Sequence, residues 1–206
     1  MPIFREHKTI FIHIPKTAGT TILRMFGYDS VPNNDMFYHI DEFFEYDHAS
    51  ALLIKSRERK IYDEFYKFTL VRNPYDRLVS EYAWKVKDND RRSLNVEDKS
   101  FKDFVHEIYC NFDKIQSQIH REKSHLIPQS HFVLDDVNVF KFENLEVLIE
   151  KLNLEYNLPI LNVKHNQTSH KLFHEYYDQD TCEMVYDMYR SDFMLFDYDK
   201  CIMKNH

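Results

Sequence analysis

The sequence predicts an α/β fold in which a parallel sheet is flanked by helices. Three apolar stretches are each followed by a helical pattern. The strand and helix pairs are 10–14 with 22–26, 68–71 with 74–86, and 137–142 with 143–152. Strands that alternate with helices form parallel sheets covered on both faces. The 206 residues, 43% of them hydrophobic, suffice for one large core but not for two, so we expect a single domain over residues 1–206.

The first strand leads directly into a turn that is rich in hydrogen-bond donors. The apolar run ends at Pro15, and the turn that follows consists of Lys16, Thr17, Ala18, Gly19, Thr20 and Thr21. Amides of such a loop, and those at the start of the next helix, point toward a bound anion. Lys16 adds a positive charge, and the three threonine hydroxyls add donors. We therefore predict a phosphate-binding site over residues 16–21.

The order of residues in this turn restricts its chemistry. The chain has only two glycines, of which Gly19 lies inside the turn and Gly27 just beyond the following helix. In the loop of ATP- and GTP-binding proteins, G-x-x-x-x-G-K-[ST], the lysine follows the glycines, whereas Lys16 precedes Gly19 here. This reversed order disfavours a kinase or a GTPase.

The second strand, 68–71, is followed by a helix with a clear start signal. Asn73 is a good N-cap and Pro74 suits the first helical position. The positions at i, i+3, i+4 and i+7 that we expect this helix to bury are Val79, Tyr82, Ala83 and Val86. Arg72 then lies at the end of the strand and Ser80 lies two turns into the helix. A guanidinium and a hydroxyl in these places can bind one phosphate.

The remaining sequence predicts three further helices and a surface segment. The helices are expected at 49–65, 101–112 and 180–189. Residues 85–100 are densely charged, which is typical of a solvated excursion from the core.

The two strand–turn–helix motifs together resemble the sulfotransferase family, whose donor is 3′-phosphoadenosine 5′-phosphosulfate (PAPS). The resemblance extends over residues 8–198 and is greatest at 15–20, at 71–80 and in the closing segment 191–198. It is nearest to the carbohydrate sulfotransferase branch, which includes the heparan sulfate 2-O- and chondroitin sulfotransferases. The resemblance implies a P-loop-NTPase-like sulfotransferase fold.

The resemblance also implies roles for the motif residues. Residues 16–21 would hold the 5′-phosphosulfate, and Arg72 with Ser80 would hold the 3′-phosphate. Lys16 would also be catalytic, because its ammonium stabilises the charge that develops on the leaving phosphate. Lys171 lies in a segment that the family closes over the nucleotide and is a further donor-site candidate. The expected reaction transfers a sulfuryl group to a hydroxyl or amine of a carbohydrate or glycoconjugate and requires no metal.

The general base is expected to be His48. Residues 48–51 open the helix before the second motif, and this part of the chain is similar to the branch in which a histidine acts as catalytic base. A neutral imidazole is suited to accept a proton near neutral pH. His13, beside the turn, is a rival that the family pattern makes a positioning residue. The carboxylates Asp41, Glu42 and Asp47 are further candidates for the base.

Two weaker candidates concern the acceptor. Gln129 resembles an acceptor-side position of carbohydrate sulfotransferases. The basic run at 55–60 would suit an acidic acceptor, but such a run is more often a solvated helix face.

Charge, hydropathy and cysteine placement argue against several kinds of partner and location. A net charge of −7 argues against a nucleic-acid partner. No stretch approaches the roughly 18 apolar residues of a membrane span, and residues 1–8 are too few and too polar for a signal peptide. The three cysteines are scattered and suggest neither a disulfide scaffold nor a metal site. We therefore expect a cytoplasmic enzyme without a transmembrane segment.

Two different functions stay open at this stage. One is a nucleotide phosphotransferase of the P-loop kinase type, which the position of Lys16 disfavours. The second is a non-catalytic nucleotide-binding domain, which the presence of Lys16, His48, Arg72 and Ser80 disfavours.

Overall fold

The computed structural model describes residues 3–27, 48–88, 99–117, 125–159 and 171–200. The chain divides into two compact units. The sheet unit consists of residues 1–71 and 131–167, and the helical unit consists of residues 72–130 and 168–206. The single domain over residues 1–206 stays a prediction.

The sheet unit is built on a predominantly parallel sheet. Its strands are β1 (Ile3–Phe4), β2 (Thr9–Ile12), β3 (Tyr66–Val71) and β4 (Asn138–Lys141), in the order β1-β2-β3-β4. The strands β2, β3 and β4 pair in parallel, whereas the short β1 pairs antiparallel with β2. The three predicted strands are therefore present, and the α/β fold with a parallel-dominated sheet between helices is confirmed.

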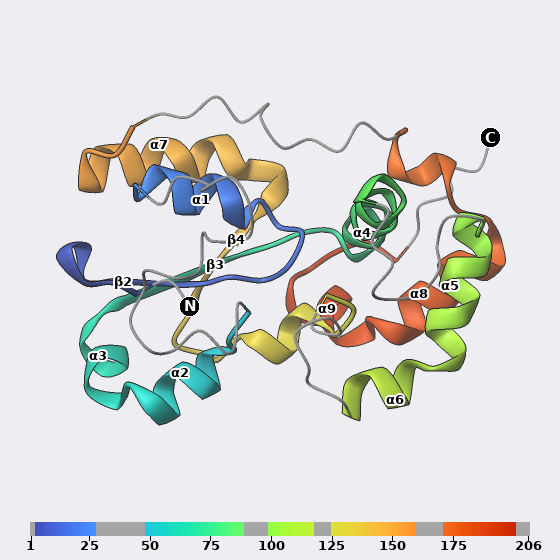
Figure 1. The fold of residues 1–206 in the computed structure, drawn as a ribbon, viewed down its shortest axis with the longest axis horizontal. Coiled ribbons are helices and arrows are strands. Elements are labelled where there is room, and N and C mark those ends of the chain that lie inside the picture. Colours follow the sequence, from blue (N-terminus) through green and yellow to red (C-terminus); the bar gives the residue numbers. More distant parts are fainter. Residues whose placement is uncertain (1–2, 28–47, 89–98, 118–124, 160–170, 201–206) are drawn as a thin grey trace. The chain divides into compact units, whose positions relative to one another are not determined.

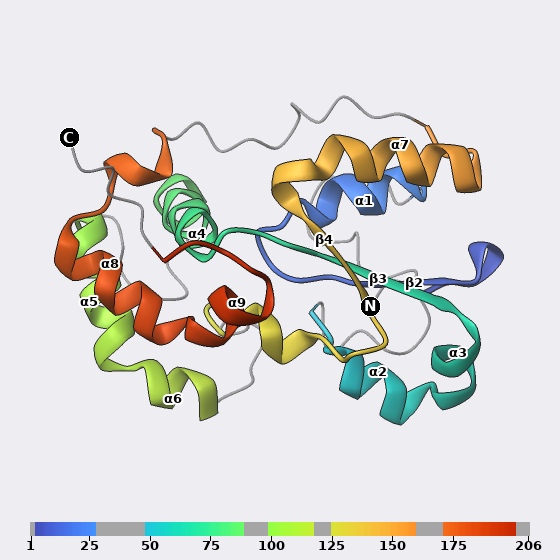
Figure 2. The same cartoon turned by 180° about the vertical axis from the view of Figure 1, so that it is seen from behind.

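Helices cover both faces of this sheet, as predicted. Helices α1 (Gly19–Met25) and α7 (Leu145–Tyr156) lie on one face, and α2 (Ala51–Arg57) and α3 (Arg59–Glu64) lie on the other (Figures 1 and 2). Side chains alternate along a strand, so that Phe68 and Leu70 point to the same face. Both are buried in one cluster with residues of α1 and α7. The sheet thereby holds the start of α1, and with it the predicted phosphate turn, at the end of β2.

The helix predicted over 49–65 is two helices. The backbone of Glu58 leaves the helical region (φ −122°, ψ 45°) between α2 and α3. No proline or glycine marks this break, which is why the sequence pattern continued across it. Ile54 before the break and Tyr62 after it are both fully buried, so both helices pack against the core.

The helical unit contains five α-helices among its described residues. They are α4 (Pro74–Asp88), α5 (Phe101–Cys110), α6 (Phe112–Ser117), α8 (Gln179–Met188) and α9 (Arg190–Leu195). The helices predicted from 74, at 101–112 and at 180–189 are present, although the second ends at Cys110 and a new helix begins after Asn111. The charged segment predicted as an excursion over 85–100 was wrong at its start, because residues 85–88 belong to α4 and Lys85 is buried. Residues 89–98 lie outside the described residues.

The start of α4 is as predicted, but its buried face is not. Asn73 caps the helix by accepting a hydrogen bond from the amide of Tyr75 (3.0 Å). Val79 is buried, whereas Val86 is 44% exposed, and Tyr82 and Ala83 are half-buried.

The buried face of α4 includes charged residues that hydropathy assigns to solvent. Glu81 and Lys85 are both buried and form an ion pair (3.4 Å) one turn apart. His125 lies 2.8 Å from the second oxygen of the Glu81 carboxylate. Charged groups tolerate burial when they are paired and hydrogen-bonded. The buried face of the helix therefore includes this network and excludes Val86.

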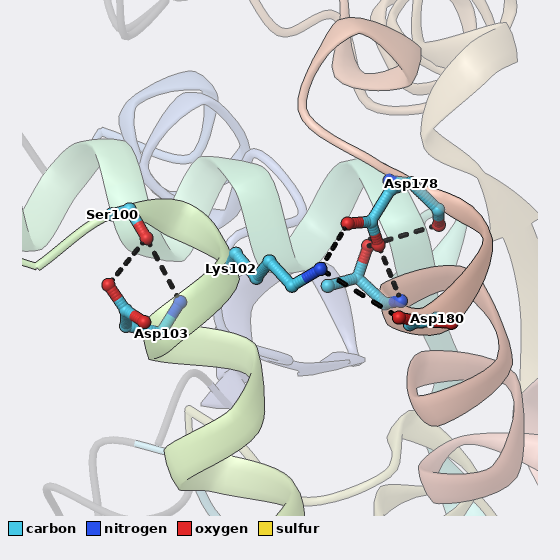
Figure 3. Close-up of polar contacts among 6 residues, drawn as sticks. Ser100, Lys102, Asp103, Asp178 and Asp180 are labelled. Carbon is cyan, nitrogen blue, oxygen red and sulfur yellow. Dashed lines mark hydrogen bonds and ion pairs between the residues drawn. The ribbon is translucent and has the colours of Figure 1, made fainter.

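A polar cluster links the N-termini of α5 and α8 (Figure 3). Asp178 caps α8 by accepting from the amide of Thr181 (2.9 Å), and the Thr181 hydroxyl accepts from the amide of Asp178 (3.0 Å). Lys102 of α5 donates to the Asp178 carboxylate (2.6 Å). The Lys102 ammonium and the Thr181 donors hold the pKa of Asp178 well below its usual range. The reciprocal cap therefore orders the start of α8.

In the part of the chain that the structure describes, no helix is long and apolar enough to cross a membrane.

Replacing Asp178 with alanine should lower the free energy of unfolding by about 1 kcal/mol, the usual value of a lost N-cap. Asp180→Ala is the matched control, because Asp180 also lies close to Lys102 (3.8 Å) but does not cap the helix. Chemical denaturation of both variants and the parent measures the difference. Equal losses in the two variants would show that charge, not capping, is responsible.

The lowered pKa of Asp178 also predicts a pH dependence. A carboxylate with a lowered folded-state pKa stabilises the protein fully above the unfolded value of about 3.9, and this contribution is lost as the pH falls toward the folded value. The difference in stability between the parent and Asp178→Ala should therefore shrink on acidification below about pH 4.

Candidate functional site

The turn after β2 has a backbone conformation that suits an anion. Lys16 (φ 66°) and Ala18 (φ 68°) both adopt left-handed conformations, with Thr17 between them. Such conformations are uncommon for residues other than glycine and cluster at functional sites. Alternation of left-handed and ordinary residues turns successive backbone amides into a concave nest that binds anions. Residues 16–18 therefore have a backbone suited to such a nest, and the phosphate site at residues 16–21 stays a prediction.

The side chain of Thr17 has a structural part in this turn. Its hydroxyl donates to the carbonyl of Ile14 (2.9 Å), and the residue is completely buried. The sequence pattern predicted that this hydroxyl would donate to the anion. In the structure it closes the turn instead, so that only the backbone amide of Thr17 suits the role of an anion ligand.

Gly19 is required by the ring of His13. A Cβ atom at position 19 would overlap the Nε2 and Cδ2 atoms of the His13 imidazole. The same ring stacks on Phe11 of β2 (5.6 Å between centroids). The glycine therefore lets α1 begin directly against the last side chains of the first strand.

His48 is held in place by His13. Its Nδ1 lies 2.9 Å from the carbonyl oxygen of His13, and the two imidazoles meet edge to face (4.5 Å between centroids). A carbonyl oxygen only accepts, so the hydrogen bond requires a proton on Nδ1. The neutral imidazole then carries its lone pair on Nε2, the state of a general base. The rival carboxylates Asp41, Glu42 and Asp47 lie outside the described residues.

Arg72 is anchored through its side chain in the helical unit. Its Nε donates to the Asp76 carboxylate (2.7 Å), and only 9% of the residue is exposed. Asp76 and Ser80 are four residues apart on α4 and therefore lie on the same face of the helix. The ion pair holds Nε of Arg72 at the face of α4 that carries Ser80. The joint role of Arg72 and Ser80 stays a prediction.

The main chain of Arg72 is anchored as well. The side-chain amide of Gln129 accepts from the Arg72 amide (2.9 Å) and donates to the Arg72 carbonyl (2.8 Å). Gln129 is completely buried. The expectation that Gln129 faces the acceptor was therefore wrong, because both ends of its amide group bind the Arg72 main chain.

Two basic candidates lie at the surface. Lys171 is exposed, while the segment before it, 166–170, is outside the described residues. In the run at 55–60, Lys55 lies 3.8 Å from Asp136 and Arg59 pairs with Asp63 (2.6 Å). These pairs agree with the interpretation of the run as a charged helix face.

Within each unit, the structure brings together residues that are distant in sequence. In the sheet unit these are His13, Gly19 and His48, and in the helical unit they are Arg72, Gln129 and Asp192. Sequence reasoning missed the supporting roles of Gln129 and Asp192. The resemblance drew attention to Gln129, but for a different role, and Asp192 lies in the closing segment 191–198. Over the described ranges, no cluster of His, Cys, Asp or Glu has the arrangement of a metal site.

Gly19→Ala should destabilise the sheet unit, because the new methyl group overlaps the His13 ring. Overpacking of this kind usually costs about 1–3 kcal/mol, and His13→Ala in the same chain should restore much of it. Gly27→Ala is the control: its left-handed φ of 83° makes alanine unfavourable, but no atom lies within 4 Å of the new Cβ. His13→Ala should therefore rescue the first substitution and not the second, as measured by denaturation in a double-mutant cycle. If His13→Ala restored the stability of Gly19→Ala and of Gly27→Ala by the same amount, the proposed contact between residue 19 and the His13 ring would be contradicted.

The comparisons with known proteins agree with both motifs. The model of the sulfotransferase family matches residues 1–199, which include most of both units. No curated protein and no solved structure matches the chain significantly. Since the family match covers almost the whole chain, the protein belongs to the sulfotransferase family.

Proposed function

We propose that this sulfotransferase moves a sulfuryl group from PAPS to a hydroxyl or amine of a carbohydrate or glycoconjugate. Membership of the family supports sulfuryl transfer in general. The observation that supports a phosphate-bearing donor is the left-handed backbone at Lys16 and Ala18, a conformation that favours an anion nest in the turn. The sequence resemblance to carbohydrate sulfotransferases supports the acceptor class.

The turn would hold the 5′-phosphosulfate. Its amides would bind the phosphate, with Thr20, Thr21 and the main chain of Thr17 to Gly19 as ligands. In the reaction the bond between sulfur and the bridging phosphate oxygen breaks, and a bond from sulfur to the acceptor oxygen or nitrogen forms. The leaving phosphate gains negative charge, which Lys16 would stabilise more in the transition state than in the ground state.

Arg72 and Ser80 would bind the 3′-phosphate. Asp76 accepts a hydrogen bond from Nε of Arg72. The two Nη groups would therefore donate to the phosphate in a charge-assisted fork. The hydroxyl of Ser80 would add a donor from the same face of α4. Lys171 would contact the nucleotide from the segment at 166–171.

His48 would act as the general base. Its Nδ1–H donates to the His13 carbonyl, which leaves Nε2 to accept the proton from the acceptor. When that proton arrives, the same carbonyl stabilises the imidazolium. His13 would thus have a positioning role, as the family pattern suggested. No metal enters this scheme, and its absence, like a cytoplasmic location, stays a prediction.

Adenosine 3′,5′-bisphosphate should bind at least about tenfold more tightly than AMP, because one charge-assisted fork contributes about 1.5–3 kcal/mol. Arg72→Lys keeps the charge but loses the fork, so this variant should lose most of the preference while AMP affinity stays the same. Arg190→Lys is the control, because Arg190 is an exposed ion-pairing residue of the helical unit. Calorimetry with both nucleotides measures the preference, and equal affinities in the parent would remove the role assigned to Arg72 and Ser80.

His48→Ala should reduce turnover by about 10²–10⁴, the usual contribution of a general base. Affinity for adenosine 3′,5′-bisphosphate should not change, because the base acts on the acceptor. Turnover is measured with an acceptor found by screening labelled PAPS against cell-envelope sugars and small hydroxyl compounds. His131→Ala, an exposed histidine of the same unit, is the control. Near-normal turnover would transfer the role to a carboxylate, and a parallel loss of nucleotide affinity would place His48 in the donor site.

A further inference from the structure

The helical unit contains a completely buried carboxylate that the proposed reaction does not use. Asp192 of α9 accepts from the main-chain amides of Gln129 and Ser130, each at 2.8 Å and each through a different oxygen. The side-chain amide of Gln129 lies 3.4 Å from the first of these oxygens. A buried carboxylate is tolerated only with such a set of donors. Asp192 therefore holds the backbone of residues 129–130 in one position.

Gln129, held in this way by Asp192, in turn fixes the main chain of Arg72. Its side-chain amide makes two hydrogen bonds to the main chain of Arg72, one as donor and one as acceptor. This is the pattern that one peptide group makes with another across a sheet. Arg72 is the first residue after β3, which ends at Val71. Gln129 therefore makes with the Arg72 main chain the two hydrogen bonds that a neighbouring peptide group would make.

Arg72 is consequently held at two points. Gln129 fixes its main chain, and Asp76 fixes Nε of its side chain. An arginine side chain has many rotamers, and ordering it when a ligand binds costs free energy. An arginine that is already held at both ends presents its guanidinium with less of this cost.

We propose that Gln129 and Asp192 are positioning residues that prepare Arg72 to bind the 3′-phosphate of the donor. The proposal rests on the proposed function for the assignment of that phosphate to Arg72. Neither residue touches the nucleotide. They act through the Arg72 main chain, so they affect only the part of the binding free energy that the 3′-phosphate contributes.

The test compares two nucleotides that differ only in the 3′-phosphate. Gln129→Met keeps the length of the side chain and removes both hydrogen-bonding groups. Asp192→Asn replaces one acceptor oxygen with a donor that faces an amide. In both variants the affinity ratio of adenosine 3′,5′-bisphosphate to AMP should fall, by up to about tenfold, because the whole contribution of the Arg72 fork is the upper limit of what its positioning can supply. AMP affinity should stay unchanged. Asp187→Asn is the control, because Asp187 is an exposed, ion-paired aspartate of α8.

The outcomes are distinguishable. If the parent protein does not prefer the bisphosphate, the proposed function fails independently of this inference. Two results would overturn the inference when the parent does prefer the bisphosphate. In the first, Gln129→Met keeps the preference; in the second, it loses affinity for both nucleotides in parallel. Either result would show that Gln129 and Asp192 have a purely structural role. If Asp192→Asn does not fold, Gln129→Met decides, because it leaves both main-chain bonds to the Asp192 carboxylate in place.

Discussion

The contacts of His13 constrain most of the candidate site in the sheet unit. Its ring occupies the space that a side chain at residue 19 would need, and its carbonyl accepts a hydrogen bond from Nδ1 of His48. The same residue follows directly after β2, whose side chains form part of the core. The start of α1 and the orientation of His48 therefore both depend on how the first strand ends.

The helical unit uses buried polar groups for a comparable purpose. Asp192 and Gln129 are completely buried and bind main-chain groups, and Arg72 is nearly buried against Asp76. Directional hydrogen bonds fix position more narrowly than apolar contacts, because each bond loses strength steeply with angle. Their burial also makes any misplacement costly, since an unpaired polar group in the core is destabilising. Such a network suits a place where one side chain must have a defined direction.

The elements of the fold were largely predictable because they depend on local signals. The strands at 10–14, 68–71 and 137–142 and the helices behind them follow from runs of apolar residues and from caps such as Asn73. Errors occurred where tertiary contacts override hydropathy. Glu81 and Lys85 are buried as a pair while Val86 is exposed, and the helix predicted over 49–65 bends at Glu58 without a local breaker.

The sequence by itself determined which residue types surround the turn at 16–21 and the strand end at Arg72, since both motifs are contiguous in the chain. Only the tertiary structure decided which distant residues hold the turn and Arg72 in position. Gln129 binds Arg72 across 57 residues of chain, and Asp192 binds Gln129 across 63. His48 binds the His13 carbonyl across 35 residues. Such contacts have no periodicity and no fixed spacing. They exist only after packing has brought the segments together, so a single sequence does not reveal them.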